Sequence, residues 1–167
     1  MATIHLIEGP VGAGKSTYAE QLSVRLRAPW LNLDEWMVTL FRPDRPDVDF
    51  MPWYIERKAR CIEQIWLVTC NLMDVRSDVI LELGLVQLSD RAAFYSKVDG
   101  TDYALQIHVL DVPRETRRNR VRARNAQQGA TFQMEVSDEI FELADGAWQA
   151  PDAIERSERR IQIISSD

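Results

Sequence analysis

Gly9-Pro10-Val11-Gly12-Ala13-Gly14-Lys15-Ser16 decides the fold of this chain of 167 residues. The stretch fits the pattern G-x-x-x-x-G-K-[ST], in which a glycine-rich loop binds the phosphates of a nucleotide. An apolar-rich segment at 3–8 precedes the stretch and is typical of a short strand, and apolar residues at 19, 22 and 26 follow it at helical spacing. Strand, glycine-rich loop and helix form the context in which this motif binds phosphate. The sequence therefore predicts a phosphate-binding loop (P-loop) with a nucleoside triphosphate as its ligand.

The residue types in the loop suit a polyphosphate. Glycines let the backbone approach closely and point its N–H groups at the ligand, and the next helix adds free N–H groups at the favourable end of its dipole. We expect Lys15 to reach the β- and γ-phosphates and the Ser16 hydroxyl to ligate Mg²⁺. A glycine-rich turn that matches the pattern by chance is disfavoured because both flanks fit. The residues expected to bind ATP are Gly9, Gly12, Ala13, Gly14, Lys15, Ser16 and Thr17.

Composition narrows the class of protein. The length and the hydrophobic fraction of 46% are those of one globular domain, expected to span 1–167. A net charge of −6 makes nucleic acid an unlikely general partner, although it leaves room for a local basic groove. Cys61 and Cys70 suggest neither a disulfide framework nor a zinc site and suit a reducing cytoplasm. With no apolar run of membrane-spanning length and no signal pattern, we expect a cytoplasmic protein without a membrane partner; its oligomeric state is left open.

Strand and helix patterns alternate along the chain. Further strands are expected at 30–33, 79–84, 103–112 and 161–164. Helices are expected at 53–74, 89–98, 114–126 and 137–148, and a Pro- and Asp-rich stretch at 42–49 is typical of an irregular loop. The alternation predicts a three-layer α/β fold, in which helices cover both faces of a five-stranded parallel sheet. Because ligands bind at the carboxyl ends of such strands, the P-loop, Asp34, Glu82 and the basic helix should gather at one edge.

These features resemble the P-loop kinases, and more narrowly a group of small predicted kinases related to polynucleotide 5′-hydroxyl kinases, zeta toxins and chloramphenicol phosphotransferase. Beyond the P-loop, the resemblance rests on Asp34 after the second strand and Glu82 in the third. It also rests on Arg120-Val121-Arg122-Ala123-Arg124-Asn125, similar to that group's R-x-x-x-R-N lid, and on 136–141 with the downstream Pro151. The resemblance covers nearly the whole chain. It implies phosphoryl transfer from ATP to a hydroxyl but no particular acceptor, because such kinases phosphorylate very different molecules.

Two acidic residues lie after or within expected strands. Asp34 is the candidate catalytic base, which would orient an acceptor hydroxyl and take its proton; Glu35 is the reserve. The alternative role for Asp34 is helix capping. Glu82 interrupts an apolar strand, where a carboxylate is costly unless it is paired or near a metal. Two roles are equally favoured for Glu82: holding Mg²⁺ through water, and forming a salt bridge at the strand end. Kinases of the resembling group often carry Asp at this position, which counts against direct ligation of the ion by Glu82.

The helix at 114–126 carries six arginines and begins a basic lid region at about 114–135. Arg117, Arg120 and Arg124 share one face of it. The resemblance implies that Arg120 and Arg124 are catalytic and neutralise charge that builds up between the β- and γ-phosphates. The alternative is a solvated charged face. We expect two or three of the six to be catalytic and the others to be solvated.

The acceptor site is expected in the loop at 41–53, where Arg42 and Arg45 could bind the substrate together with nearby aromatic residues. An ordinary surface loop is equally favoured. Arg91, after the third strand, is a further candidate for substrate contact. The leading hypothesis is an ATP-dependent phosphotransferase that acts on a hydroxyl of a small-molecule or nucleoside-like acceptor. The alternatives are a 5′-hydroxyl polynucleotide kinase, and a nucleotide-binding regulatory or toxin-like module that acts through a protein partner.

Overall fold

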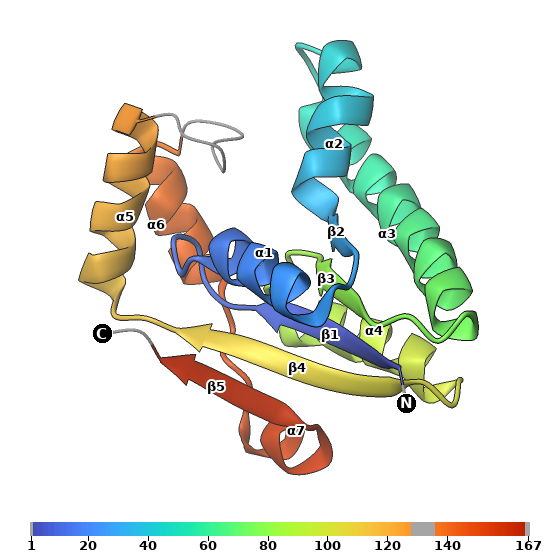
Figure 1. Cartoon of the computed structure of the whole chain (residues 1–167). Coiled ribbons are helices and arrows are strands. Elements are labelled where there is room, and N and C mark those ends of the chain that lie inside the picture. The colour runs from blue at the N-terminus through green and yellow to red at the C-terminus, as the bar shows by residue number, and fades with distance from the viewer. Residues whose placement is uncertain (1, 128–135, 166–167) are drawn as a thin grey trace.

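A parallel β-sheet organises the chain, whose computed structural model describes residues 2–127 and 136–165 (Figure 1). Within these residues, five strands pair in the order β2-β3-β1-β4-β5, and every pair is parallel. The strands are β1 (Thr3–Glu8), β2 (Trp30–Asn32), β3 (Val79–Glu82), β4 (Ala104–Asp111) and β5 (Ile161–Ser165). The strand that leads into the P-loop therefore lies at the centre of the sheet, as the predicted α/β fold requires.

Helices connect the strands, because parallel neighbours need a crossover. They are α1 (Lys15–Leu26), α2 (Leu33–Phe41), α3 (Phe50–Asp74), α4 (Leu88–Asp99), α5 (Arg114–Gln127), α6 (Asp138–Ala147) and α7 (Ala153–Glu158), with a 3₁₀ turn, η1 (Arg42–Asp44), between α2 and α3. Among residues 2–127 and 136–165, no helix combines the length and the apolar character that a membrane span requires.

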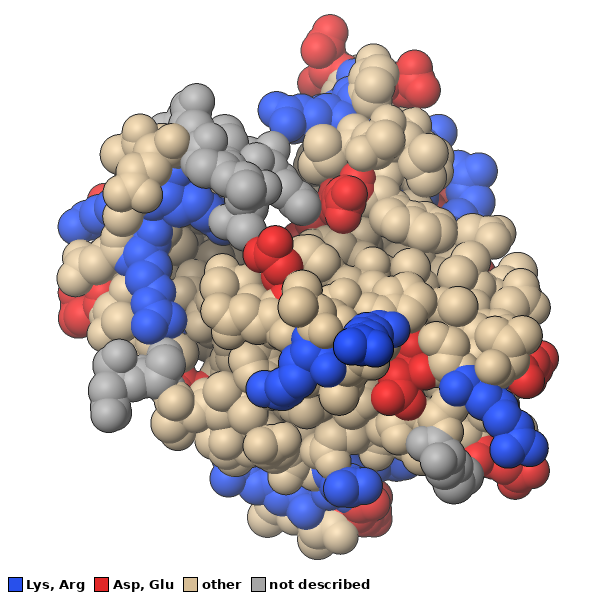
Figure 2. Space-filling model, in the orientation of Figure 1, with Lys and Arg blue, Asp and Glu red and all other residues tan. Residues whose placement is uncertain are grey.

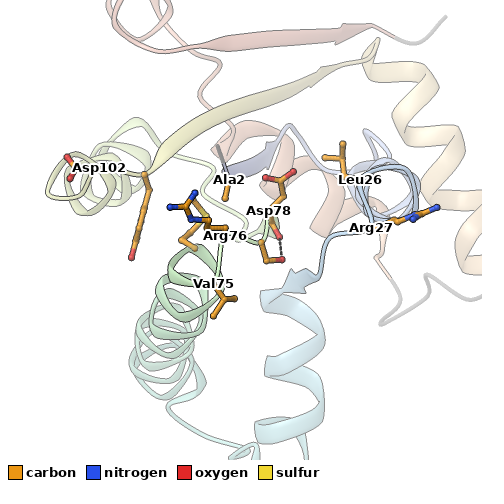
Figure 3. Close-up of a pocket in the computed structure, with 10 residues that line it drawn as sticks. Ala2, Leu26, Arg27, Val75, Arg76, Asp78 and Asp102 are labelled. Atoms are coloured by element: carbon orange, nitrogen blue, oxygen red, sulfur yellow. Dashed lines mark hydrogen bonds between the residues drawn. The ribbon is translucent and has the colours of Figure 1, made fainter.

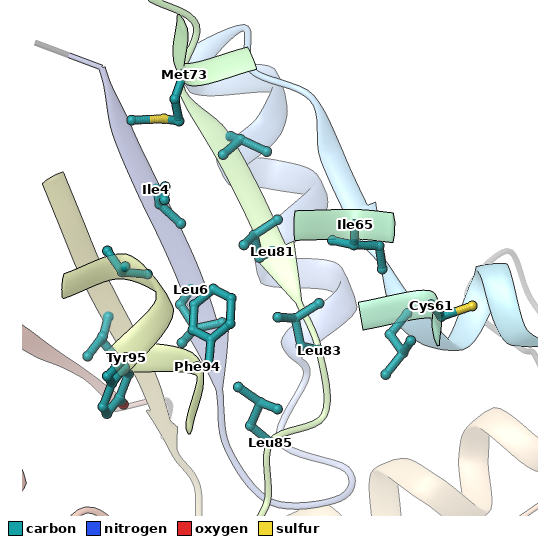
Figure 4. Packing of buried hydrophobic residues seen from close by; sticks show 14 of the residues in the cluster. Ile4, Leu6, Cys61, Ile65, Met73, Leu81, Leu83, Leu85, Phe94 and Tyr95 are labelled. Atoms are coloured by element: carbon teal, nitrogen blue, oxygen red, sulfur yellow. The ribbon is translucent and has the colours of Figure 1, made fainter. Parts of the chain in front are cut away.

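Two hydrophobic layers hold the helices on opposite faces of the sheet. Successive strand residues point to opposite faces, so Ile7 packs with Ala19 of α1 on one side. Its neighbour Leu6 packs on the other side in a cluster that includes Ile65 of α3 and Phe94 of α4 (Figure 4). Burial of this apolar surface is the main favourable contribution to folding. The three-layer prediction is confirmed.

Element boundaries differ from the predicted ones mainly between residues 30 and 53. The second strand ends at Asn32, because the Asn32 side chain caps α2, which begins at Leu33. Part of the expected irregular loop is η1, and α3 begins at Phe50 rather than at 53. A short helix at 153–158 was not predicted; the Asp152 side chain caps it by accepting a hydrogen bond from the Glu155 amide.

The P-loop edge of the sheet lies between two projecting helix pairs. The helices α2 and α3 rise on one side of α1, and α5 and α6 rise on the other (Figure 1). The space-filling view shows a hollow between the two projections, with Lys and Arg side chains gathered over α5 (Figure 2). The loop that follows the central strand thus lies between the two helix pairs (Figure 1).

A second hollow, of about 950 Å³, lies at the amino ends of the strands (Figure 3). Arg27 and Arg76 line it, and both have positive φ angles of 53° and 60°. The Asp78 carboxylate, also in its lining, accepts a hydrogen bond from the Thr3 amide at 2.7 Å. This carboxylate thus fixes the start of β1. The hollow lies at the opposite end of the strands from the P-loop, away from the edge where ligands of parallel sheets bind.

Candidate active site

The P-loop backbone depends on glycine at a position where α5 packs closely. Gly12 has a φ of +75°, and a Cβ atom there would lie 2.7 Å from the Arg117 carbonyl oxygen and 2.9 Å from a methyl carbon of Val121. Any side chain would therefore strain the backbone and push α5 away. Helix α1 begins after Gly14 without a side-chain cap, so its first N–H groups remain available to an anion. This backbone fits the phosphates of a nucleotide.

Lys15 and Ser16 begin α1 and point in different directions. Lys15 is a partly buried residue, and its ammonium group donates to the Pro10 carbonyl oxygen at 3.0 Å, across the loop. Burial lowers the pKa of Lys15, while the nearby carboxylates of Glu82 and Asp34 raise it. Both carboxylates are thus close enough to the ammonium to influence its charge. Lys15 lies where it could move from its intraloop bond to a bound phosphate.

Glu82 ends β3 and lies beside Ser16. The Ser16 hydroxyl donates to Glu82 Oε1 at 2.9 Å, and the Asn32 side-chain amide donates to Glu82 Oε2 at 3.2 Å. The side chain is nearly buried, and this burial raises the pKa of Glu82, against the opposing effects of Lys15 and Ser16. A hydroxyl and a carboxylate are oxygen donors of the kind that Mg²⁺ prefers. The residues present therefore fit a magnesium ion, with Ser16 and Glu82 as the groups that would hold it.

Asp34 lies in the first turn of α2 and is exposed to solvent. Its charge adds to the raised pKa of Tyr54 and opposes the burial that lowers the pKa values of Lys15 and Arg124, so Asp34 lies near both the P-loop and α5. The alternative role of Asp34 as the helix cap is wrong, because Asn32 is the capping residue.

Asn32 is a site residue that the sequence analysis missed. Its side-chain oxygen accepts hydrogen bonds from the backbone amides of Asp34 at 2.9 Å and Glu35 at 3.3 Å. Asparagine is among the preferred residues at helix N-caps, and this preference could have identified it. The predicted strand ran one residue too far, to Leu33, and so concealed the cap.

Four arginines of α5 form ion pairs with acidic residues of α6. Arg114 and Arg118 both pair with Glu142, and Arg122 pairs with Asp138 at 2.7 Å. Arg117 pairs with Asp145, also at 2.7 Å. Arg114 and Arg122 remain exposed, as expected of a solvated face, although both are ion-paired. The expectation of solvation is wrong for Arg117, which is buried between α6 and the P-loop, and Arg118 is partly buried. The pairing of these four arginines leaves Arg120 and Arg124 facing the P-loop.

Arg117 connects this ion-paired layer with the P-loop. Its guanidinium donates to the carbonyl oxygens of Val112 at 3.0 Å and Val11 at 3.1 Å, and only 6% of the residue is exposed. Such buried, charge-assisted bonds fix the backbone geometry. Arg117 therefore holds the loop itself, and its guanidinium is already occupied.

Arg120 and Arg124 approach the nucleotide side of the loop. Arg120 donates to the Ala13 carbonyl oxygen at 3.3 Å. Arg124 is half-buried, and among the described residues its Nε atom has no hydrogen-bond acceptor. Burial lowers the pKa of Arg124, and the charge of Asp34 opposes this shift. A partly buried guanidinium with a free donor beside a P-loop is suited to a phosphate oxygen. Residues 128–135 of the expected lid region lie outside the described residues.

Arg45 and its neighbours form a stack of rings and guanidinium groups at the start of α3. The Arg45 guanidinium lies 4.1 Å from the centre of the Phe50 ring, and the centres of the Phe50 and Tyr54 rings are 5.6 Å apart. Burial raises the pKa of Tyr54, and so does the charge of Asp34. The stack therefore extends from the neighbourhood of Asp34 outward. Arg42 lies nearby in η1 and is exposed. Substrate contact by Arg42 and Arg45 remains a prediction.

Arg91 is not placed to contact a substrate, and that expectation is wrong. The side chain is 0% exposed, and its guanidinium forms two hydrogen bonds with the Glu155 carboxylate at 2.8 and 2.9 Å. The Tyr95 hydroxyl donates to the same carboxylate at 2.7 Å. Arg91 therefore joins α4 to α7 in the interior, and Glu155 lies too far along the chain for local sequence patterns to reveal the pair.

Glu8, the last residue of β1 before the P-loop, shares this buried cluster. Its Oε2 atom lies 3.6 Å from Arg91 Nε, a longer contact than that of Glu155, which already occupies the guanidinium. Burial raises the pKa of Glu8 from its ordinary value of 4.5 to about 8, since Arg91 offsets the desolvation only in part. Two carboxylates that compete for one buried guanidinium favour a protonated Glu8 at neutral pH.

Stability should therefore fall as pH rises toward 8. The folded state keeps a proton on Glu8 that the unfolded chain releases above its ordinary pKa of 4.5, so the stabilisation is complete below about pH 4.5 and is lost as pH rises to about 8. Glu8→Gln mimics the protonated form and should be more stable than the wild type at pH 8.5 by about 1–2 kcal/mol, with little difference at pH 5. Urea unfolding at several pH values measures this difference. Parallel pH profiles for the two proteins would contradict the assignment.

The sequence of residues 4–145 matches the AAA_33 family, which is described as an AAA domain. The chain belongs to this family. A search among curated proteins found no match to this AAA_33 domain. The family and the fold together confirm the resemblance to P-loop kinases that the motifs predicted.

Solved structures share the fold of this AAA_33 domain. Kti12 of Chaetomium thermophilum, in complex with ADP-AlF3, aligns with a TM-score of 0.73 at 12% identity, covering 98% of this chain and 89% of that chain. The Mycobacterium tuberculosis APS kinase CysC, in complex with AMPPNP and APS, aligns at 0.64 with 17% identity, covering 99% and 89%. A chain of the Pnkp1/Rnl/Hen1 RNA repair complex aligns at 0.60 with 22% identity; the match covers 95% of this chain but 46% of that one.

Proposed function

We propose that this AAA_33 domain, as one unit over residues 1–167, transfers the γ-phosphate of ATP to a hydroxyl of a small-molecule or nucleoside-like acceptor. The observation that carries the proposal is the convergence of three charged groups at the P-loop. Asp34 comes from α2, Lys15 from α1 and Arg124 from α5, and the charge of Asp34 influences both cations. A base and two cations around a phosphate-binding loop are the groups that phosphoryl transfer needs.

Each group has a role in the proposed reaction. The acceptor oxygen forms a bond to the γ-phosphorus, and the bond from that phosphorus to the oxygen of the leaving ADP breaks. The acceptor's proton passes to the Asp34 carboxylate. Lys15 and Arg124 lie where they would neutralise the oxygens of the transferred group, while Arg120, bonded to Ala13, would approach from the loop. Mg²⁺, held by Ser16 and Glu82 when bound, would neutralise charge on the β- and γ-phosphates.

The similar structures support an ATP-dependent reaction with a small acceptor. CysC was solved with AMPPNP and APS, which are a nucleotide analogue and a second nucleotide-like ligand in one protein of this fold. The present chain covers most of that kinase, so the same fold at similar size accommodates two such ligands. The ring and guanidinium stack of Phe50, Tyr54 and Arg45 would offer a second ligand flat surfaces and a positive charge near Asp34.

A 5′-hydroxyl polynucleotide kinase is the second candidate function. The alignment with a chain of the RNA repair complex favours it, although that chain is more than twice as long as the matched part. The net charge of −6 counts against it. Binding of an oligonucleotide that weakens steeply with salt would favour this candidate, since backbone contacts release counterions.

The test is transfer from γ-labelled ATP with Mg²⁺ to a panel of metabolites and 5′-hydroxyl oligonucleotides. We expect a labelled small-molecule product that disappears in Lys15→Ala, because that variant removes the charge that would reach the β- and γ-phosphates. A labelled oligonucleotide would establish the second candidate instead. ATP binding without any labelled product would contradict both and support a regulatory or toxin-like module that acts through a protein partner.

A further inference from the structure

Asn32 joins the two halves of the candidate site through a single side chain. It ends β2, is 3% exposed and lies opposite Glu82 in the register of β2 and β3. Its oxygen faces the amides of Asp34 and Glu35, and its NH₂ group faces the Glu82 carboxylate. The orientation of the amide is determined by these neighbours. If the amide group of Asn32 were rotated by half a turn, its oxygen would face the Glu82 carboxylate and its NH₂ group would face the backbone N–H groups of Asp34 and Glu35, and both contacts would be repulsive.

The hydrogen bonds of Asn32 continue to the P-loop. One Glu82 oxygen accepts from Asn32 and the other from the Ser16 hydroxyl, so the carboxylate is held from both sides. A series of bonds thus runs from the start of α1, through Glu82 and Asn32, to the first turn of α2. In a nearly buried setting such a network is rigid when all its members are satisfied, and a shift of one member moves the next.

Helix α2 is short, and its cap adds to the support that Leu33 and Met37 receive from the core. It has nine residues, and a helix of that length is marginal without tertiary support. The cap fixes the first turn, which contains Asp34, and the Glu82 contact fixes the cap. The position of the proposed base is therefore tied to the carboxylate that would hold Mg²⁺.

We infer that Asn32 is a positioning residue that couples magnesium binding at Ser16 and Glu82 to the placement of Asp34. This inference rests on the proposed function, because it takes Ser16 and Glu82 as the metal-binding residues and Asp34 as the base that acts on the acceptor. With Mg²⁺ bound, the Glu82 carboxylate is fixed, Asn32 is fixed with it, and the first turn of α2 becomes more ordered. The acceptor's base would then be held more firmly when the metal–nucleotide complex is present.

Asn32→Ser separates the two connections of this residue. Serine caps helices about as well as asparagine, so the bonds to the amides of Asp34 and Glu35 can be retained. Serine is too short to keep the bond to Glu82 Oε2. Asn32→Asp is a second variant with the same logic, since aspartate also caps well but presents a carboxylate instead of a donor to Glu82. The second variant keeps the test valid if the first folds poorly.

The decisive measurement is hydrogen exchange of the amides of Asp34 and Glu35 with AMPPNP, with and without saturating Mg²⁺. In the wild type we expect Mg²⁺ to slow their exchange by about threefold or more. In Asn32→Ser and Asn32→Asp this magnesium-dependent slowing should disappear while Mg²⁺ and AMPPNP still bind. Slowing that persists in both variants, or that is absent in the wild type, would overturn the inference.

Kinetics supply a second readout that a purely structural role would not move. Asn32→Ser should lower kcat about tenfold with the KM for ATP within about twofold, because the nucleotide still binds but the base is less well placed. A change in the KM for ATP as large as the change in kcat would contradict the positioning role of Asn32. The exchange experiment needs no acceptor, so its result does not depend on phosphoryl transfer. A wild-type protein that transfers no phosphate would refute the proposed function, whereas the exchange data alone would decide whether Asn32 couples the two sites.

Discussion

Arg124→Ala should lower the rate of phosphoryl transfer by about 10³-fold or more, the effect of removing an arginine that stabilises the transferred phosphoryl group. The expectation rests on position. Arg124 is half-buried beside the P-loop, its Nε atom has no acceptor among the described residues, and the charge of Asp34 reaches it. A guanidinium held in this way gains its partner when a phosphate binds. Single-turnover transfer to the acceptor identified by the panel measures the effect.

Arg122→Ala is the matched control on the same helix. Its guanidinium pairs with Asp138 on the outer side of α5, where both groups are largely exposed. Loss of an exposed pair of this kind should leave stability nearly unchanged and change kcat by less than about twofold. Similar losses of kcat in the two variants would show that α5 acts through its overall charge. An Arg124→Ala protein within tenfold of wild type would refute the catalytic role.

Asp34→Asn should lower kcat by about 10²- to 10⁴-fold, the usual contribution of a general base. Asparagine keeps the size of the side chain and its place in the first turn of α2, so the cap by Asn32 is unaffected. ATP affinity should stay within about threefold, because a base that acts only in transfer contributes little to nucleotide binding. Calorimetric titration of AMPPNP and transfer assays on the same preparation measure both quantities.

Glu35→Gln is the control for Asp34. Glu35 is the neighbouring carboxylate in the same turn and the reserve candidate for the base, so its replacement tests whether any acid in this turn suffices. We expect kcat within about threefold of wild type. If Glu35→Gln lost kcat and Asp34→Asn kept it, Glu35 would be the base instead. Loss of ATP affinity in Asp34→Asn would show instead that Asp34 supports the nucleotide site.

Local patterns predicted most of the scaffold. The strand, glycine-rich loop and helix around residues 9–16 were recognised because their signals lie within one short segment, and the alternation of strands and helices then required a parallel sheet. The convergence of the P-loop, Asp34, Glu82 and α5 followed from the same rule, since each lies at or just after the carboxyl end of a strand.

Contacts between distant segments escaped prediction. Helical spacing set Arg124 apart from Arg122, but it did not reveal that Asp138, Glu142 and Asp145 of α6 pair with the other arginines of α5. The spacing of these acids along α6 could have suggested a common face. Arg91 was misassigned because its partner, Glu155, comes from a short helix that carried no periodic signal.

The arm formed by α2, η1 and the start of α3 joins the sheet through β2, an edge strand of three residues. The strands that lead into the P-loop and α5, β1 and β4, both lie inside the sheet and do not pair with β2. Insertions and exchanges within the arm can therefore be accommodated while the strands that carry the P-loop and α5 keep their register. In evolution or in protein engineering, the arm could therefore be exchanged as a unit. Any replacement would have to preserve the hydrogen bond between Asn32 and Glu82.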